Sequence, residues 1–140
     1  MRVLVDSSAW VDFFNDYDSP ERRAVADLLV SDHTICTCGV VVAEVFQGLR
    51  KPAGRERLAE RFRDLDFLEA HGIDLHFRAA DLYRALRQRG KTIRSTIDCL
   101  IAVLAEEHGC ALLARDRDME TILESGVLRL SRWPVDAPPA

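Results

Sequence analysis

Short apolar segments alternate with helical stripes along the chain, and this alternation limits the possible folds more than any other feature. Strands that alternate with helices predict a parallel sheet, because right-handed crossovers bring each new strand beside an earlier one. The helices then pack on both faces of that sheet. We therefore expect an α/β fold with a small, mostly parallel central sheet between two helical layers. The expected strands are residues 2–5, 34–38, 67–69, 110–114 and 127–130.

Capping residues and apolar stripes predict helices between these strands. Asp6 ends the first strand and begins a helix, while Ser19 and Pro20 are the cap and first turn of a second helix. A stripe of apolar residues at helical spacing runs toward Gly90, and a denser apolar run follows Ser95. The remaining helices are expected at about residues 40–49, 54–64, 75–90 and 95–109, with a short one after residue 116.

The chain has 140 residues, enough for one core, and we expect a single domain at residues 1–133 with a loose tail at 134–140. Hydrophobic residues make up 48% and charged residues 30%, which excludes a disordered chain. Asp6 and Asp12 interrupt the N-terminus, where a signal peptide would need an unbroken apolar segment. Because the apolar stretches are short, we expect a cytoplasmic protein without a membrane segment.

The four cysteines have no spacing typical of a zinc site. They form no CxxC pair, and no histidine lies at ligand spacing from them. We therefore expect reduced and mostly buried thiols at Cys36, Cys38, Cys99 and Cys110.

The formal net charge of −4 argues against nucleic-acid binding through bulk electrostatics. Nearly all the basic residues are nevertheless arginine, the side chain best shaped for phosphate. An arginine-rich composition also follows from a GC-rich genome. One basic cluster would form either a local phosphate-binding surface or a solvated helix face; it comprises Arg50, Lys51, Arg55, Arg57, Arg61 and Arg63.

Acidic residues directly follow two of the predicted strands. Asp6 follows the first strand, and Asp116 and Asp118 follow the strand at 110–114. Ligand sites in open parallel sheets form at the carboxyl ends of the strands, near the point where strand order reverses. If these two strands are neighbours, their acids meet at one edge. The structural alternative is that Asp6 and Asp116 are helix N-caps and that Asp118 is a first-turn acid.

Two further acids lie in strongly apolar helices. Asp98 precedes a segment that is apolar all round, so the first turn of a buried helix would direct its carboxylate inward. Glu44 has apolar neighbours on both sides, and a carboxylate there needs a partner because isolated buried charge is costly. The alternative for Asp98 is a capping box with Ser95. The alternatives for Glu44 are an ion pair with Lys51 or a position on a narrow solvent-facing strip.

Several carboxylates in one place repel one another by about 1 kcal/mol per pair in water, and by more when they are shielded from it. Helix caps alone would not gather them. A divalent cation removes the repulsion, and oxygen ligands without histidine or cysteine suit Mg²⁺ or Mn²⁺. Such ions activate water and neutralise the leaving oxygen in phosphodiester hydrolysis. The acids therefore predict a metal-dependent nuclease.

The order of these motifs resembles a PIN domain, and specifically a VapC-type toxin of a bacterial toxin–antitoxin pair. The resemblance covers residues from about 2 to 130, and it depends on an ordered set of motifs. These are Val-Leu-Val-Asp6-Ser7-Ser8, Val42-Ala43-Glu44-Val45, Asp98-Cys-Leu-Ile-Ala102 and Leu113-Ala-Arg-Asp116-Arg-Asp118. Where the family usually has phenylalanine after the last acid, this chain has Met119, a conservative apolar change.

The resemblance implies a Mg²⁺- or Mn²⁺-dependent endoribonuclease that cuts structured RNA such as tRNA or rRNA and so inhibits translation. It also assigns roles by position. The catalytic acids would be Asp6, Glu44, Asp98 and Asp116; the metal ligands would be Asp6, Asp98, Asp116 and Asp118; and Ser8 would order the pocket through hydrogen bonds, unless it is only a helix-start serine.

The resemblance further implies a homodimer and an antitoxin whose C-terminal segment packs in a groove near the first helices and blocks the pocket. Trp10, Phe13 and Phe14 are candidates to line that groove. An aromatic stripe at helical spacing is also typical of a core, and we expect at least one of the three to be core.

Three other functions fit the fold less well. A phosphatase with an aspartyl nucleophile typically needs a second Asp two positions after the first, where this chain has Ser8. A phospho-accepting receiver domain needs a lysine after a late strand, and neither Lys51 nor Lys91 lies there. A non-catalytic binding module with the PIN fold remains the alternative. The presence of every pocket acid weakens it.

Overall fold

A four-stranded sheet lies at the centre of the computed structural model, which describes residues 1–49 and 53–135. Every pair of neighbouring strands is parallel, so the sheet is entirely rather than mostly parallel. The strands are β1 (Arg2–Val5), β2 (Thr34–Cys38), β3 (Asp66–Leu68) and β4 (Ala111–Leu113), in the order β3-β2-β1-β4. This confirms the predicted α/β fold.

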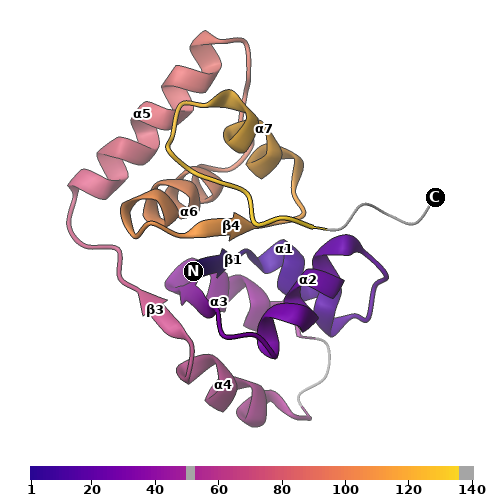
Figure 1. Cartoon of the computed structure of the whole chain (residues 1–140). Helices are drawn as coiled ribbons and strands as arrows, with labels where there is room; N and C mark the ends of the chain where they lie inside the picture. The colour runs from indigo at the N-terminus through magenta and orange to yellow at the C-terminus, as the bar shows by residue number, and fades with distance from the viewer. Residues whose placement is uncertain (50–52, 136–140) are drawn as a thin grey trace.

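Apart from α4, the helices in the described part of the chain form two groups. By their mutual contacts, α1, α2 and α3 make one group and α5, α6 and α7 make the other. Figure 1 shows α5, α6 and α7 together above β4, and α1, α2 and α3 together below it. The helices are α1 (Ser7–Phe14), α2 (Pro20–Leu29), α3 (Gly39–Gln47), α4 (Arg55–Arg63), α5 (Asp74–Gln88), α6 (Thr96–Glu107) and α7 (Arg117–Ser125).

The core follows from the apolar patterns of the sequence. Val3, Leu4 and Val5 of the central strand β1 are fully buried, as expected for a strand covered on both faces. The apolar run in α6 is buried from Ile101 to Ala105, so this helix is a core element. The predicted stripe of α5 is also buried, and it comprises Leu75, Ala79, Leu82 and Leu86.

The strand order reverses between β1 and β4. The chain places β2 and β3 on one side of β1, and then returns to place β4 on the other side. The carboxyl ends of β1 and β4 are therefore neighbours, and the backbone N–H of Asp6 donates to the carbonyl of Leu113 at 2.8 Å. This is the arrangement in which open parallel sheets form ligand sites.

The prediction of a final strand at residues 127–130 is wrong. Gly126 ends α7 in the left-handed region, and the chain then returns toward β4 without pairing to it. Val127, Leu128 and Leu130 pack against the core, so their apolar character reflects burial rather than a strand. Pairing with β4 begins later, where Arg132 forms an isolated parallel bridge with Leu112.

The predictions for the cysteines and for a core aromatic residue are confirmed, and the basic cluster is described only in part. All four cysteines are free and buried, as predicted. Trp10 is 2% exposed and contacts the rings of Phe13 and Phe14, which confirms it as core. In the basic cluster, Arg55 and Arg63 pair with neighbouring glutamates, while Arg50 and Lys51 lie outside the described residues. None of the described helices is both long and apolar enough to cross a membrane.

Candidate functional site

An acidic cleft of about 580 Å³ opens at the carboxyl ends of β1 and β4. Six of the side chains that line it are carboxylates, contributed by four segments of the chain. They come from the end of β1 and α1, from α3, from the first turn of α6, and from the start of α7. The lining residues are Asp6, Ser7, Ser8, Val11, Asp12, Glu44, Arg94, Ser95, Asp98, Arg115, Asp116 and Asp118.

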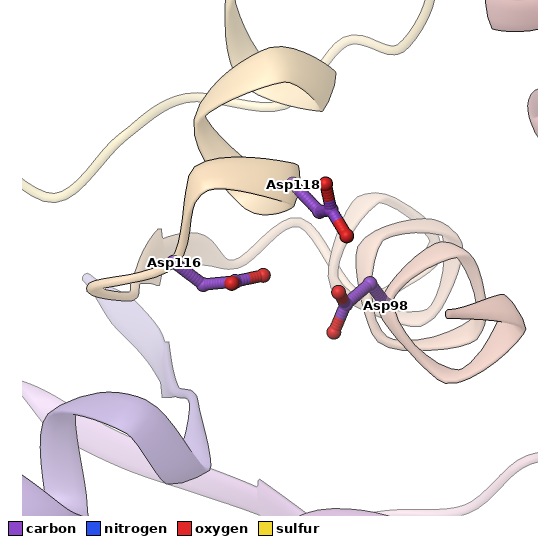
Figure 2. A group of neighbouring side chains, drawn as sticks. All are labelled: Asp98, Asp116 and Asp118. Carbon is purple, nitrogen blue, oxygen red and sulfur yellow. The ribbon is translucent and has the colours of Figure 1, made fainter. Parts of the chain in front are cut away.

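Three of these carboxylates converge on one point. Figure 2 shows the side chains of Asp98, Asp116 and Asp118 directed toward the same space between α6 and the start of α7. One oxygen from each lies within 4.8 Å of the others. Asp6 lies outside this group of three, although it lines the same cleft. Oxygen ligands at this spacing fit a hard divalent cation such as Mg²⁺ or Mn²⁺.

Asp6 is held at the end of β1 by a serine. Its Oδ2 atom accepts hydrogen bonds from the backbone N–H of Ser8 at 3.2 Å and from the Ser8 hydroxyl at 2.6 Å. The Ser8 hydroxyl in turn accepts from the backbone N–H of Arg115 at 2.9 Å. Because Arg115 directly precedes Asp116, Ser8 links the two neighbouring strand ends that carry the acids.

Glu44 reaches the cleft from α3, which packs against α1. Its side chain is half-buried, and its Oε1 atom accepts a hydrogen bond from the Ser7 hydroxyl at 3.2 Å. Burial raises the pKa of Glu44, and the charge of Asp6 raises it further. The alternative partner Lys51 lies outside the described residues.

The crowding of carboxylates disturbs their ionisation. Burial raises the pKa of Asp6, although hydrogen bonds from Ser8 oppose this effect. The pKa of Asp98 rises to about 8, first because of burial and then because of a hydrogen bond with Asp116 and the charges of the neighbouring acids. A bound cation would remove this repulsion, so the metal-free cluster is an unfavourable arrangement of charge.

Structural and functional interpretations of these acids coexist in the molecule. Asp6 and Asp116 are N-caps of α1 and α7, as the structural alternative predicted, and both also line the cleft. Asp98 is different, because the cap of α6 is Ser95, whose hydroxyl accepts from the backbone N–H of Ile97. Capping therefore explains two of the acids, whereas Asp98 is not a cap and its only structural role is that of an acid in the first turn of α6.

Three charged residues of the cleft were not predicted from the sequence. Asp12 is 8% exposed and forms an ion pair with Arg115, whose Nη1 lies 3.1 and 3.2 Å from the two carboxylate oxygens. Arg94 contacts Asp118, with its Nε atom 3.3 Å from Oδ2. These pairs join residues far apart in the chain. The sequence offered no local signal for these pairs, since Asp12 lies near the end of α1 and its partner Arg115 directly precedes Asp116.

Replacing Asp98 is expected to stabilise the metal-free protein by an amount that grows with pH. In the unfolded chain Asp98 ionises near its ordinary pKa of 3.8, whereas the folded metal-free protein keeps that proton up to about pH 8. Between these values the folded state binds more protons, so its free energy of unfolding falls as pH rises. A neutral amide at this position would remove the loss. Because the half-buried carboxylate is screened by solvent, Asp98→Asn should gain only about 2 kcal/mol above about pH 8, well below the full pKa difference converted at roughly 1.4 kcal/mol per unit.

Urea denaturation of the wild-type protein and Asp98→Asn in EDTA, across a pH series, measures this difference. The gain should be small near about pH 4 and reach its maximum above about pH 8. A difference that stays constant across the series would show that Asp98 ionises normally in the folded protein.

Comparison with known proteins places the chain in a family. The PIN domain family matches residues 3–123. A VapC ribonuclease of Mycobacterium bovis is 36% identical over 122 residues, which cover 86% of this chain and 90% of the relative. Ribonuclease VapC11 of Mycobacterium tuberculosis has the same identity and coverage.

Solved structures share the fold of this chain. VapBC2 from Rickettsia felis, crystallised with a DNA fragment from its promoter, matches with a TM-score of 0.66 and 22% identity over 96% of this chain and 100% of that chain. VapC20 of Mycobacterium tuberculosis, described as a sarcin-ricin loop cleaving toxin, matches with a TM-score of 0.59 and 19% identity over 92% and 98%. The match to the PIN domain family and the 36% identity to VapC ribonucleases show that the chain belongs to the PIN domain family and, within it, to the VapC proteins.

Proposed function

We propose that this chain is a divalent-metal-dependent endoribonuclease and the toxin of a toxin–antitoxin pair. The observation that carries the proposal is the convergence of Asp98, Asp116 and Asp118 in a cleft that Asp6 and Glu44 also line. Its lining is strongly acidic, which suits a bound cation more than the direct binding of a polyanion. The 36% identity to VapC ribonucleases supports the same activity.

The metal site would be formed by four acids. Asp98, Asp116 and Asp118 would hold Mg²⁺ or Mn²⁺, with Asp6 completing the set from the end of β1. A bound ion supplies Lewis acidity, which favours deprotonation of water and offsets negative charge on the phosphate and the leaving oxygen. Ser8 would keep the Asp6 carboxylate in place through its 2.6 Å hydrogen bond.

Glu44 would act as the proton acceptor in the cleft. Its raised pKa brings its proton affinity closer to that needed for general-base catalysis near neutral pH. The hydrogen bond from Ser7 fixes one carboxylate oxygen and leaves the other free to accept a proton from the attacking water. The products would be two RNA fragments, with the phosphodiester P–O bond broken and one water consumed.

The chain would act with a protein partner and on a structured RNA. The relatives crystallised as VapBC pairs support an antitoxin partner and a toxin–antitoxin hetero-oligomer, and we also propose a homodimer of this chain. VapC20, which is described as cleaving the sarcin-ricin loop, supports structured RNA, either tRNA or rRNA, as the substrate class. Residues 1–133 would act as one domain, with cleavage in the cytoplasm.

Metal-dependent cleavage of RNA tests the proposed function. Purified, antitoxin-free protein should cut total cellular RNA into discrete fragments with Mg²⁺ or Mn²⁺, and EDTA should reduce the rate by at least about a hundredfold. Adding excess metal back should restore the rate. Cleavage that persists in EDTA would contradict the metal site. A folded protein that binds RNA without cutting it under any of these conditions would be the non-catalytic binding module.

A further inference from the structure

The cleft contains two arginines, and the protein holds them in different ways. Among the described residues that line it, only Arg94 and Arg115 carry a positive charge, against six carboxylates. A nucleic acid that approaches this surface meets strong like-charge repulsion, which one divalent cation offsets only in part. A positive group free to contact phosphate would therefore have a large effect on substrate binding.

Arg115 is already committed to protein partners. Its Nη1 atom donates to both oxygens of Asp12, and its Nη2 atom donates to the hydroxyl of Tyr17 at 3.3 Å. Its guanidinium also lies over the ring of Tyr17, 4.5 Å from the centroid. Because Asp12 is buried, releasing Arg115 would leave that carboxylate without its counter-charge. Arg115 is therefore part of the scaffold of the cleft.

Arg94 is anchored at its base and free at its tip. Its backbone N–H donates to Oδ2 of Asp118 at 3.0 Å, and its Nε donates to the same oxygen at 3.3 Å. Its side chain is 71% exposed, and neither of its Nη groups hydrogen-bonds to a residue in the described part of the chain. The guanidinium thus has a fixed attachment beside the acid cluster and two donor groups left for a ligand.

These properties match a planar phosphate contact. A guanidinium binds phosphate oxygens through paired N–H donors, and it retains its charge at any physiological pH. The anchor on Asp118 also limits the entropy that the long side chain would lose on binding. An acidic protein segment meets the same repulsion as RNA, but only RNA would also place a phosphodiester at the proposed metal site, so RNA is the favoured ligand.

We propose that Arg94 binds a backbone phosphate of the RNA adjacent to the phosphodiester that is cleaved. The two Nη groups make this contact while Nε stays on Asp118. The contact is independent of base identity, because phosphate is common to all nucleotides. This inference rests on the proposed function and adds a substrate-binding residue to the same cleft.

The salt dependence of RNA binding tests this inference without relying on catalysis. A fluorescein-labelled RNA hairpin is titrated with Asp98→Asn protein, which serves as the uncleaving parent, in EDTA and at several KCl concentrations. Each phosphate contact contributes about 0.7 to the slope of log K against log salt for single strands and about 0.9 for duplex. Adding Arg94→Ala should lower the slope by about one such increment and weaken binding about five- to tenfold at the lowest salt.

Two further variants make the result specific. Arg94→Lys keeps the charge, so it should keep most of the slope while losing the paired geometry. Arg129→Ala removes the same charge at the other end of α6, where the backbone N–H of Arg129 donates to Glu106, and it should leave the slope unchanged. Thermal melting of each variant confirms that it is folded.

The outcomes separate this inference from the proposed function. If the wild-type chain cuts RNA with metal but Arg94→Ala has the slope of its parent, or changes it no more than Arg129→Ala does, Arg94 makes no phosphate contact and only this inference fails. If the folded wild-type chain does not cut RNA with any metal, the proposed function fails, and the inference that rests on it fails too.

Discussion

Asp98→Asn is expected to reduce the rate of RNA cleavage by about a thousandfold, the upper range for loss of one preorganised electrostatic contact in an active site. The amide side chain is nearly the same size as the carboxylate, but it would supply no negative charge to the cluster with Asp116 and Asp118. The bound cation would lose a charged ligand, and with it the Lewis acidity aimed at the phosphate. Initial rates of cleavage of a labelled RNA in Mg²⁺ measure the effect.

An exposed aspartate on a neighbouring helix provides the matched control. Asp81→Asn makes the same chemical change on α5, at a residue that is exposed and does not line the cleft, and its cleavage rate should equal that of the wild type. Since Asp98→Asn is expected to be at least as stable as the wild type without metal, unfolding would not explain its loss of activity. Normal cleavage by Asp98→Asn would contradict both the metal site and its assigned residues.

The sequence predicted the main features of the cleft because topology controls them. Asp6 and Asp116 follow strands directly, and a parallel sheet brings the carboxyl ends of neighbouring strands together. The strand order confirmed the condition that β1 and β4 are neighbours. Asp98 and Glu44 were predicted by a different argument, because a carboxylate in an apolar helix needs either solvent or a polar partner. Both line the cleft.

The features that the sequence did not predict depend on side-chain contacts across the fold. Arg115 pairs with Asp12 across 103 positions of the chain, and no local pattern specifies such a partner. The prediction of a strand at residues 127–130 was wrong for a related reason. Its apolar residues pack against the core without joining the sheet. Pairing with β4 depends on where the returning chain meets the sheet edge, which is at Arg132.

Arg115→Ala is expected to lower the free energy of unfolding by about 2 to 3 kcal/mol. Removing one partner of a buried ion pair leaves the other charge uncompensated, which typically costs about 3 to 5 kcal/mol. The expected cost is smaller here because the Arg115 side chain is 44% exposed. After the change, Asp12 would keep only the hydrogen bond from the Ser19 hydroxyl, at 2.9 Å. Urea denaturation near neutral pH measures the loss.

Adding Asp12→Asn to Arg115→Ala distinguishes stranded charge from lost packing. The substituted amide would be neutral and would still accept the hydrogen bond from Ser19, so the double variant should recover about half or more of the lost stability. If packing of Arg115 against Tyr17 were the main contribution, the double variant would be no more stable than Arg115→Ala. Recovery would show that Asp12, although it lines the acidic cleft, has its charge balanced within the scaffold. The remaining carboxylates of the cleft are then the ones left for the cation.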